Sequence, residues 1–131
     1  MGKNRLNFIT EIASTHNGKF NIVENIFRKH IKTDSDFIKL QIINSNFLYK
    51  KGTKKNVRFK KLELPKDKIE KLINNYYKKT KIILELFDQS TFEYVIKFKN
   101  KVDIKISCSE ADNVDFVLKI LKNFKKVFLN F

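Results

Sequence analysis

Two short segments near the N-terminus combine ionisable side chains with apolar, strand-like sequence. Residues 11–18 (EIASTHNG) place the carboxylate of Glu11 ahead of an Asn-Gly turn signal. Residues 36–41 (DFIKLQ) place Lys39 and Gln41 two positions apart, so both side chains point to one face of a strand. Because α/β enzymes keep their active sites at the carboxyl ends of parallel strands, the two segments favour an enzyme scaffold.

Three of the ionisable side chains suit the binding of an anionic substrate. Glu11 could act as an acid or base, accept a hydrogen bond from a substrate hydroxyl, or pair with Lys39. Lys39 and Lys105 each interrupt an apolar run, where an ammonium group needs a partner. That partner is either a buried carboxylate or a substrate anion. Two such lysines favour a cradle for a doubly charged phosphorylated acid.

The remaining reactive side chains carry weaker signals. Cys108 is the only cysteine, which excludes an internal disulfide and fits a reducing cytoplasm. We expect it to be a small buried residue rather than a nucleophile. His16 either reaches a site from its turn or lies in solvent, and His30 is expected to be structural, because a cation favours a helix C-terminus. Two histidines would make only a thin metal site.

Composition indicates one folded domain with a strongly basic surface. The 131 residues include 13 phenylalanines and 42% hydrophobic residues, enough for a core. The net charge of +14 is typical of nucleic-acid binders, but the lysines are spread along the whole chain and arginine occurs only at positions 5, 28 and 58. We therefore favour the compositional bias of an AT-rich genome. No apolar stretch approaches transmembrane length, and a cytoplasmic location is expected.

Apolar spacing predicts strands and helices in alternation. Strands are expected at residues 7–13, 37–43, 82–87, 102–107 and 127–131. Four helices are expected, at residues 20–31, after Pro65, after an N-cap at Asp88, and at residues 114–124. Residues 44–63 are expected to form a long, exposed, basic connection. The alternation predicts a parallel sheet, either a complete small open sheet or the first half of an eight-stranded barrel.

At these positions the chain resembles the N-acylneuraminate (sialic acid) synthase family. Residues 11–18 resemble the family's E-I-G-x-N-H-N-G, residues 37–41 its V-K-F-Q strand, and residues 86–88 its P-F-D segment. Residues 105–113 resemble K-I-A-S-G-E-x-x-N, and residues 127–130 resemble V-I-L-S. The order and spacing of these segments hold along essentially the whole chain, and the ordered set is more specific than any single motif.

The resemblance implies a TIM-type (β/α)8 barrel, of which residues 1–131 would form the first half as a single partial domain. It implies the condensation of phosphoenolpyruvate with an N-acylated amino sugar to a nine-carbon sialic-type acid, with release of inorganic phosphate. It also implies a divalent metal, manganese or magnesium, bound by histidines in the second half of the barrel, which this chain lacks.

The resemblance also implies roles for individual residues. By matched position, Lys39 and Lys105 would bind phosphoenolpyruvate, Gln41 would contact the sugar, and Glu11 would lie at the reacting centre.

Three further positions depart from the family pattern. Glu85 stands where the family has a phosphate-binding threonine, and a carboxylate repels a phosphate. Cys108 and Asn130 replace serines as substrate-binding residues. A thiol is the weaker hydrogen-bond partner, whereas Asn130 could still donate.

Two other functions fit the sequence. A non-catalytic half-barrel would bind a partner chain, because strands without closure leave two sheet edges to pair, and we expect self-association. A basic nucleic-acid binder is the other, for which we expect only weak, non-specific binding. Whether this chain by itself is an enzyme is left unassigned.

Overall fold

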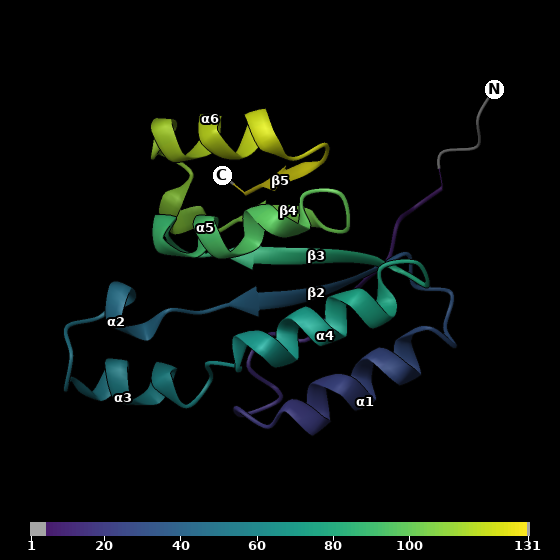
Figure 1. Cartoon of the computed structure of the whole chain (residues 1–131), viewed down its shortest axis with the longest axis horizontal. Coiled ribbons are helices and arrows are strands. Elements are labelled where there is room, and N and C mark those ends of the chain that lie inside the picture. The colour runs from purple at the N-terminus through teal and green to yellow at the C-terminus, as the bar shows by residue number, and fades with distance from the viewer. Residues whose placement is uncertain (1–4, 131) are drawn as a thin grey trace.

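Five parallel strands form one sheet in the sequential order β1-β2-β3-β4-β5 (Figure 1). The structure is a computed structural model and describes residues 5–130. The strands are β1 (Ile9–Glu11), β2 (Phe37–Ile42), β3 (Lys81–Leu86), β4 (Asp103–Ile106) and β5 (Val127–Leu129). A doubly wound open sheet reverses its strand order, whereas a barrel adds strands in sequence. The predicted parallel α/β fold is confirmed, and the strand order is that of a partial barrel.

Six α-helices lie within the described residues, two more than the sequence predicted. In Figure 1, α1 and α4 lie together below β2 and β3, and α5 and α6 lie above them. A 3₁₀ turn at Gln89–Thr91 precedes α5 and a second one, Ile96–Phe98, follows it, so the helix predicted after Asp88 is present but irregular. The helices are α1 (Phe20–His30), α2 (Ser45–Leu48), α3 (Lys54–Lys60), α4 (Lys66–Tyr76), α5 (Phe92–Val95) and α6 (Val114–Asn123).

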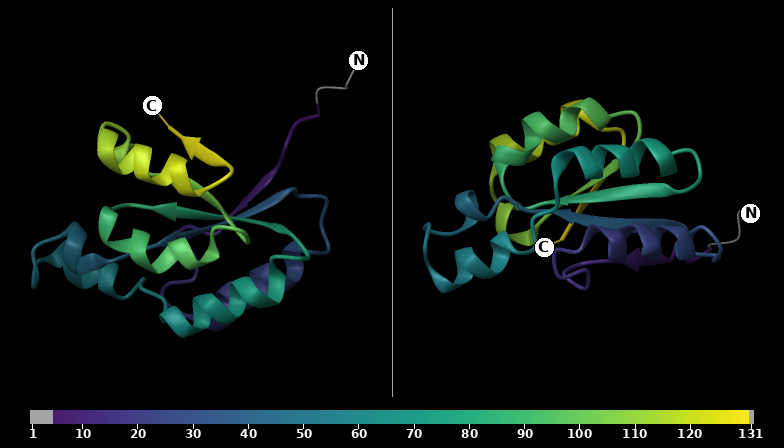
Figure 2. Two further views of the ribbon diagram at one scale, coloured as in Figure 1. Left: turned by 45° about the horizontal axis from the view of Figure 1, so that its top comes forward. Right: turned by 60° about the horizontal axis from the view of Figure 1, so that its bottom comes forward.

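Side-chain alternation gives the sheet two different faces. Ile38, Leu40 and Ile42 of β2 point to the helices and belong to the buried core, together with Val23 and Phe27 of α1. The residues between them point to the other face, where the ionisable side chains of the strands lie. Figure 2 shows β5 turned well away from the direction of β2 and β3, so the sheet twists strongly.

The first strand is shorter than predicted. Its ladder covers Ile9–Glu11, and Ala13 already has a positive φ of 44°. The turn that follows confirms the Asn-Gly signal, because Asn17 and Gly18 have φ values of 45° and 77°. A Cβ atom at Gly18 would lie 1.9 Å from the carbonyl oxygen of Lys61, so this position also requires glycine for space. The predicted end of the last strand, residue 131, lies outside the described residues.

The basic connection after β2 is mostly exposed, as predicted, but it is not an irregular loop. It folds into α2 and α3, and Ser45 and Asn56 are buried within it. The Asn56 amide donates to the Ser45 carbonyl at 3.0 Å, and the Ser45 backbone N–H donates to Glu63 at 2.7 Å. Thr53 caps α3 by accepting from the Asn56 backbone N–H at 3.2 Å. Polar contacts of this kind leave no apolar periodicity in a sequence.

Both histidines are buried, which corrects two expectations. His30 bonds through Nδ1 to the Thr10 hydroxyl at 2.8 Å and through Nε2 to the Thr80 hydroxyl at 2.7 Å. Its structural role is confirmed, but burial lowers its pKa, so it is not a cation at the helix end. His16 lies neither in solvent nor at the candidate site: it is buried, and its Nδ1 accepts from the Gly18 backbone N–H at 3.0 Å. Burial also lowers the pKa of His16.

No helix within residues 5–130 combines the length and the apolar character needed to cross a bilayer.

Candidate active site

Ionisable side chains from four neighbouring strands meet on the face of the sheet that the helices leave free. Glu11 of β1 lies opposite Lys39 of β2 in the ladder, and Glu85 of β3 lies between Gln41 of β2 and Lys105 of β4. Residues in register on neighbouring strands point to the same side, so these five side chains converge. Four of them form what we call the charge cluster: Glu11, Lys39, Glu85 and Lys105.

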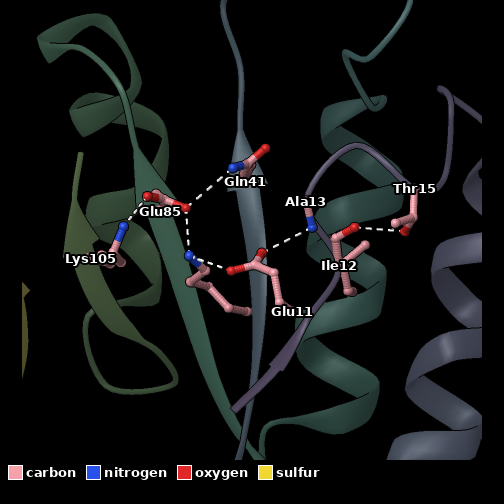
Figure 3. Close-up of polar contacts among 8 residues, drawn as sticks. Glu11, Ile12, Ala13, Thr15, Gln41, Glu85 and Lys105 are labelled. Carbon is pink, nitrogen blue, oxygen red and sulfur yellow. Dashed lines mark hydrogen bonds and ion pairs between the residues drawn. The ribbon is translucent and has the colours of Figure 1, made fainter. Parts of the chain in front are cut away.

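Glu85 is the centre of the charge cluster (Figure 3). Lys39 donates to one Glu85 oxygen at 2.8 Å, and Lys105 donates to the other. The Gln41 amide donates to the same oxygen as Lys39, at 3.3 Å. Lys39 also pairs with Glu11 at 2.5 Å. The sequence left open whether the partner of Lys39 and Lys105 is a buried carboxylate or a substrate anion. In the structure it is a buried carboxylate, which forms an ion pair with both lysines.

The charge cluster is buried at its centre and balanced in charge. Glu85 is 5% exposed and Lys39 9%, whereas the side chain of Glu11 is 43% exposed. Burial disfavours the ionised form of Glu85, but its bonds to Lys105 and Lys39 outweigh burial and lower its pKa. Burial likewise disfavours the ammonium of Lys39, but its bonds to Glu11 and Glu85 raise its pKa. The charge cluster thus sets two lysines against two carboxylates.

A cavity of about 230 Å³ opens beside the charge cluster and draws on all five strands. Ile9 of β1 and Phe128 of β5 both line it, although these strands are the two ends of the sheet. The Phe37 ring of β2 also meets the Phe128 ring edge-on, with centroids 5.8 Å apart. The sheet is therefore concave on this face. The cavity is lined by Ile9, Glu11, Lys39, Ile83, Lys105, Phe128, Leu129 and Asn130.

Most of the predicted site residues come together at this cavity. Glu11, Lys39, Lys105 and Asn130 line it. Gln41 donates a hydrogen bond to Glu85. It also lines a second cavity of about 280 Å³, together with Asn44, Glu63, Lys66, Ser90 and Tyr94.

Cys108 is the exception among the predicted residues. It is exposed, where a buried residue was expected, and it does not line the cavity beside the charge cluster. The reason is that β4 ends at Ile106, so the chain has already left the sheet when a 3₁₀ turn begins at Cys108. Ser107 is the buried residue at this point.

Sequence reasoning missed two features of the site. The apolar wall of Ile9, Ile83 and Phe128 was not predicted, although alternation along each strand places these residues on the face of the charge cluster. Glu85 was recognised as a departure from a family pattern, but not as the residue that bridges two lysines. The register between β2, β3 and β4 creates that bridge, and a single sequence does not contain the register.

The side chains at this site do not fit a divalent metal. Within residues 5–130, no three His, Cys, Asp or Glu side chains are grouped to hold an ion. Glu11 and Glu85 are neutralised by lysines, and both histidines use ring nitrogens in bonds to their own chain.

Solved structures with a similar fold include two whose names bear on function. One is the N-acetylneuraminic acid (sialic acid) synthetase from Leptospira borgpetersenii serovar Hardjo-bovis in complex with citrate, with a TM-score of 0.83 and 20% identity over 96% of this chain. The chain shares the fold of a sialic acid synthetase. The other is a spore coat polysaccharide biosynthesis protein E from Chromobacterium violaceum, with a TM-score of 0.71 and 22% identity over 95% of this chain.

The fold likeness to sialic acid synthetase covers only part of that protein. The chain spans 44% of the synthetase and 40% of the spore coat protein, less than half of each. No protein-family model matches the sequence, and no curated protein matches it. The comparisons thus confirm the fold as a partial (β/α) barrel of the sialic acid synthetase type.

Proposed function

We propose that this chain is the phosphoenolpyruvate-binding part of a sialic-acid-synthase-like enzyme. The observation that carries the proposal is the convergence of Lys39 and Lys105 on a single carboxylate beside a cavity lined by all five strands. Two ammonium groups that can bind one carboxylate suit a small acid with a carboxylate and a phosphate. The synthetase with the same fold is in complex with citrate, which is likewise a small acid with more than one anionic group.

The other predicted site residues also have roles in this proposal, which follow from where they lie around the cavity. Glu11 is the most exposed carboxylate of the charge cluster, and its second oxygen accepts from the Ala13 backbone N–H at 3.0 Å. It would act on the reacting groups as an acid, a base or a hydroxyl acceptor. Gln41 would contact the N-acylated amino sugar, and Asn130 would donate to the acid. Cys108 would contribute only if its turn moved toward the cavity.

The proposed reaction joins phosphoenolpyruvate and an N-acylated amino sugar into a nine-carbon acid and releases inorganic phosphate. Manganese or magnesium would be bound outside residues 5–130, whose side chains are not grouped to hold an ion. We propose a cytoplasmic location for the protein. Its single, exposed cysteine fits this location, because the cytoplasm keeps thiols reduced.

Phosphate release from phosphoenolpyruvate tests this function. With N-acetylmannosamine and manganese present, release by the chain should fall about 100-fold in Lys39→Ala and in Lys105→Ala, since each substitution removes a charge that binds the acid. Lys101→Ala is the matched control, because Lys101 bonds to Asn74 at the surface. No release, or release that neither substitution changes, would defeat the enzymatic hypothesis for this chain.

The second candidate function is a half-barrel that binds a partner chain, here a second copy. Within the described residues, β1 and β5 each pair with a single strand, so both edges of the sheet are unpaired. Beside the β1 edge, Leu6, Phe8 and Ile9 are 76%, 61% and 45% exposed. Unpaired edges next to apolar side chains favour association.

Sedimentation velocity tests the association. We expect the wild-type chain to sediment as dimers or larger species at micromolar concentration, and Phe8→Lys to weaken association because a lysine blocks an edge strand. Phe47→Lys is the control: Phe47 is 57% exposed in α2, away from both edges. A single monomeric species of the wild-type chain would contradict this candidate.

A further inference from the structure

The carboxylate of Glu85 is bound as a substrate anion would be. Three donors from two strands converge on it: the ammonium groups of Lys39 and Lys105, and the amide of Gln41. Both oxygens are used, one toward β2 and the other toward β4. At 5% exposure the group is almost removed from water, so these donors replace its hydration.

This arrangement leaves no uncompensated ammonium at the cavity. Lys105 has Glu85 as its carboxylate partner among the described residues, and Lys39 has Glu85 and Glu11. An external anion that enters the cavity meets two positive and two negative charges at short range. Its attraction to the lysines is therefore offset by repulsion from the carboxylates, and above all from Glu85, which lies between the lysines.

Glu11 is less suited than Glu85 to block an anion. Its side chain is 43% exposed and has one ammonium partner, Lys39, beside the Ala13 backbone N–H, so turning into water costs it less than it would cost Glu85. Glu85 is held by three donors from the strands on either side of its own. The residue that decides whether an anion is bound is therefore Glu85.

We propose that Glu85 is a tethered internal anion, which occupies the anion site of this protein and keeps its affinity for free phosphate and phosphorylated acids low. The proposal rests on the proposed function only in taking Lys39 and Lys105 as the anion-binding groups. It adds a specificity-determining residue: with Glu85 charged, the site disfavours dianions, and without that charge the same two lysines bind them.

Glu85→Gln tests the proposal, because it removes the charge and keeps the shape and one carbonyl acceptor. We expect calorimetric titration at constant ionic strength to give binding of inorganic phosphate and of phosphoenolpyruvate about tenfold tighter than in wild type. Glu70→Gln is the matched control: it makes the same charge change at an exposed carboxylate that pairs with Lys97 at 2.5 Å. We expect less than a twofold change there. Adding Lys105→Ala to Glu85→Gln should remove the gain.

Thermal unfolding keeps the test decisive if Glu85→Gln folds poorly. Phosphate should raise the midpoint of Glu85→Gln by several degrees more than that of wild type, with chloride matched for ionic strength. Glu85→Ser, which also opens space between the two lysines, should show the same differential shift. Variants that neither bind phosphate more tightly nor gain midpoint from it would overturn the proposal.

The outcome is separable from that of the phosphate-release assay. Tighter binding in Glu85→Gln without turnover in wild type supports the internal anion and rejects the enzyme. Turnover in wild type with no gain in Glu85→Gln supports the enzyme and rejects the internal anion.

Discussion

Lys39→Met is expected to lower the free energy of unfolding by about 3 kcal/mol, the size of effect seen when one partner of a buried ion pair is removed. Methionine keeps most of the length of the lysine stem, so the loss comes from the charge. Glu85 is then left in the interior with Lys105 and Gln41, while Glu11 can turn to solvent. Urea unfolding at pH 7.5, followed by circular dichroism, measures the change.

The surface pair Lys97–Glu70 supplies a control with the same contact distance. Its N–O separation is 2.5 Å, equal to that of Lys39–Glu11, but its side chains are 45% and 44% exposed. Lys97→Met should therefore change the free energy of unfolding by less than about 0.5 kcal/mol. If both substitutions cost the same, contact distance and not burial would determine the strength of these pairs.

A double substitution separates the pair from the packing of its members. Removing the charge of Glu85 as well, in Lys39→Met with Glu85→Gln, should recover part of the stability that Lys39→Met loses, because the charge cluster then again holds as many carboxylates as ammonium groups, Glu11 and Lys105. Equal losses in the single and double variants would place the effect of Lys39→Met in packing alone.

The fold was largely predictable because the chain alternates two apolar periods. Apolar residues recur at strand spacing in β2 and β3 and at helical spacing in α1 and α6. Each pattern extends over enough residues to be recognised. The choice between an open sheet and a barrel was not predictable from periodicity, because strand order in space leaves no trace in spacing along the chain. The extra helices α2 and α3 were missed for a different reason: buried polar bonds of Ser45 and Asn56 hold them together.

At the site, the sequence predicted which lysines matter but not what binds them. Lys39 and Lys105 stand out because each is a charge within an apolar strand. Their common partner, Glu85, depends on the register of three strands. Cys108 was expected to be buried because a free cysteine behaves as a small apolar residue, but it begins the 3₁₀ turn after β4 and is exposed.

Acid is expected to destabilise the protein as the pH falls below 6.5, and His30→Gln is expected to reduce that loss. Burial lowers the pKa of His30 from its ordinary value of 6.5, so the unfolded chain takes up the proton first. The stability linked to His30 is thus present above pH 6.5 and is lost as the pH falls through the lowered pKa. Glutamine cannot be protonated there, so its variant should lose less stability on acidification.

At pH 7.5 the same variant should be less stable than wild type by about 1 to 2 kcal/mol. A neutral imidazole has one donor and one acceptor nitrogen on opposite sides of the ring, which suits the hydroxyls of Thr10 and Thr80. The single amide of glutamine does not reach both. Urea midpoints of the two proteins at pH 7.5, 6.5 and 5.5 measure both effects, and we expect the curves to converge toward low pH.

The pH at which stability is lost distinguishes the contribution of the histidines from that of the charge cluster. The pKa of Glu85 is held below its ordinary value of 4.5, so the stability linked to Glu85 is lost only as the pH falls below that value. His16 also has a pKa lowered by burial, so His30→Gln should keep a residual slope that His16 produces. Parallel pH curves for wild type and His30→Gln would show that His30 accepts its proton without loss of its two threonine contacts, and that it carries no part of the acid sensitivity.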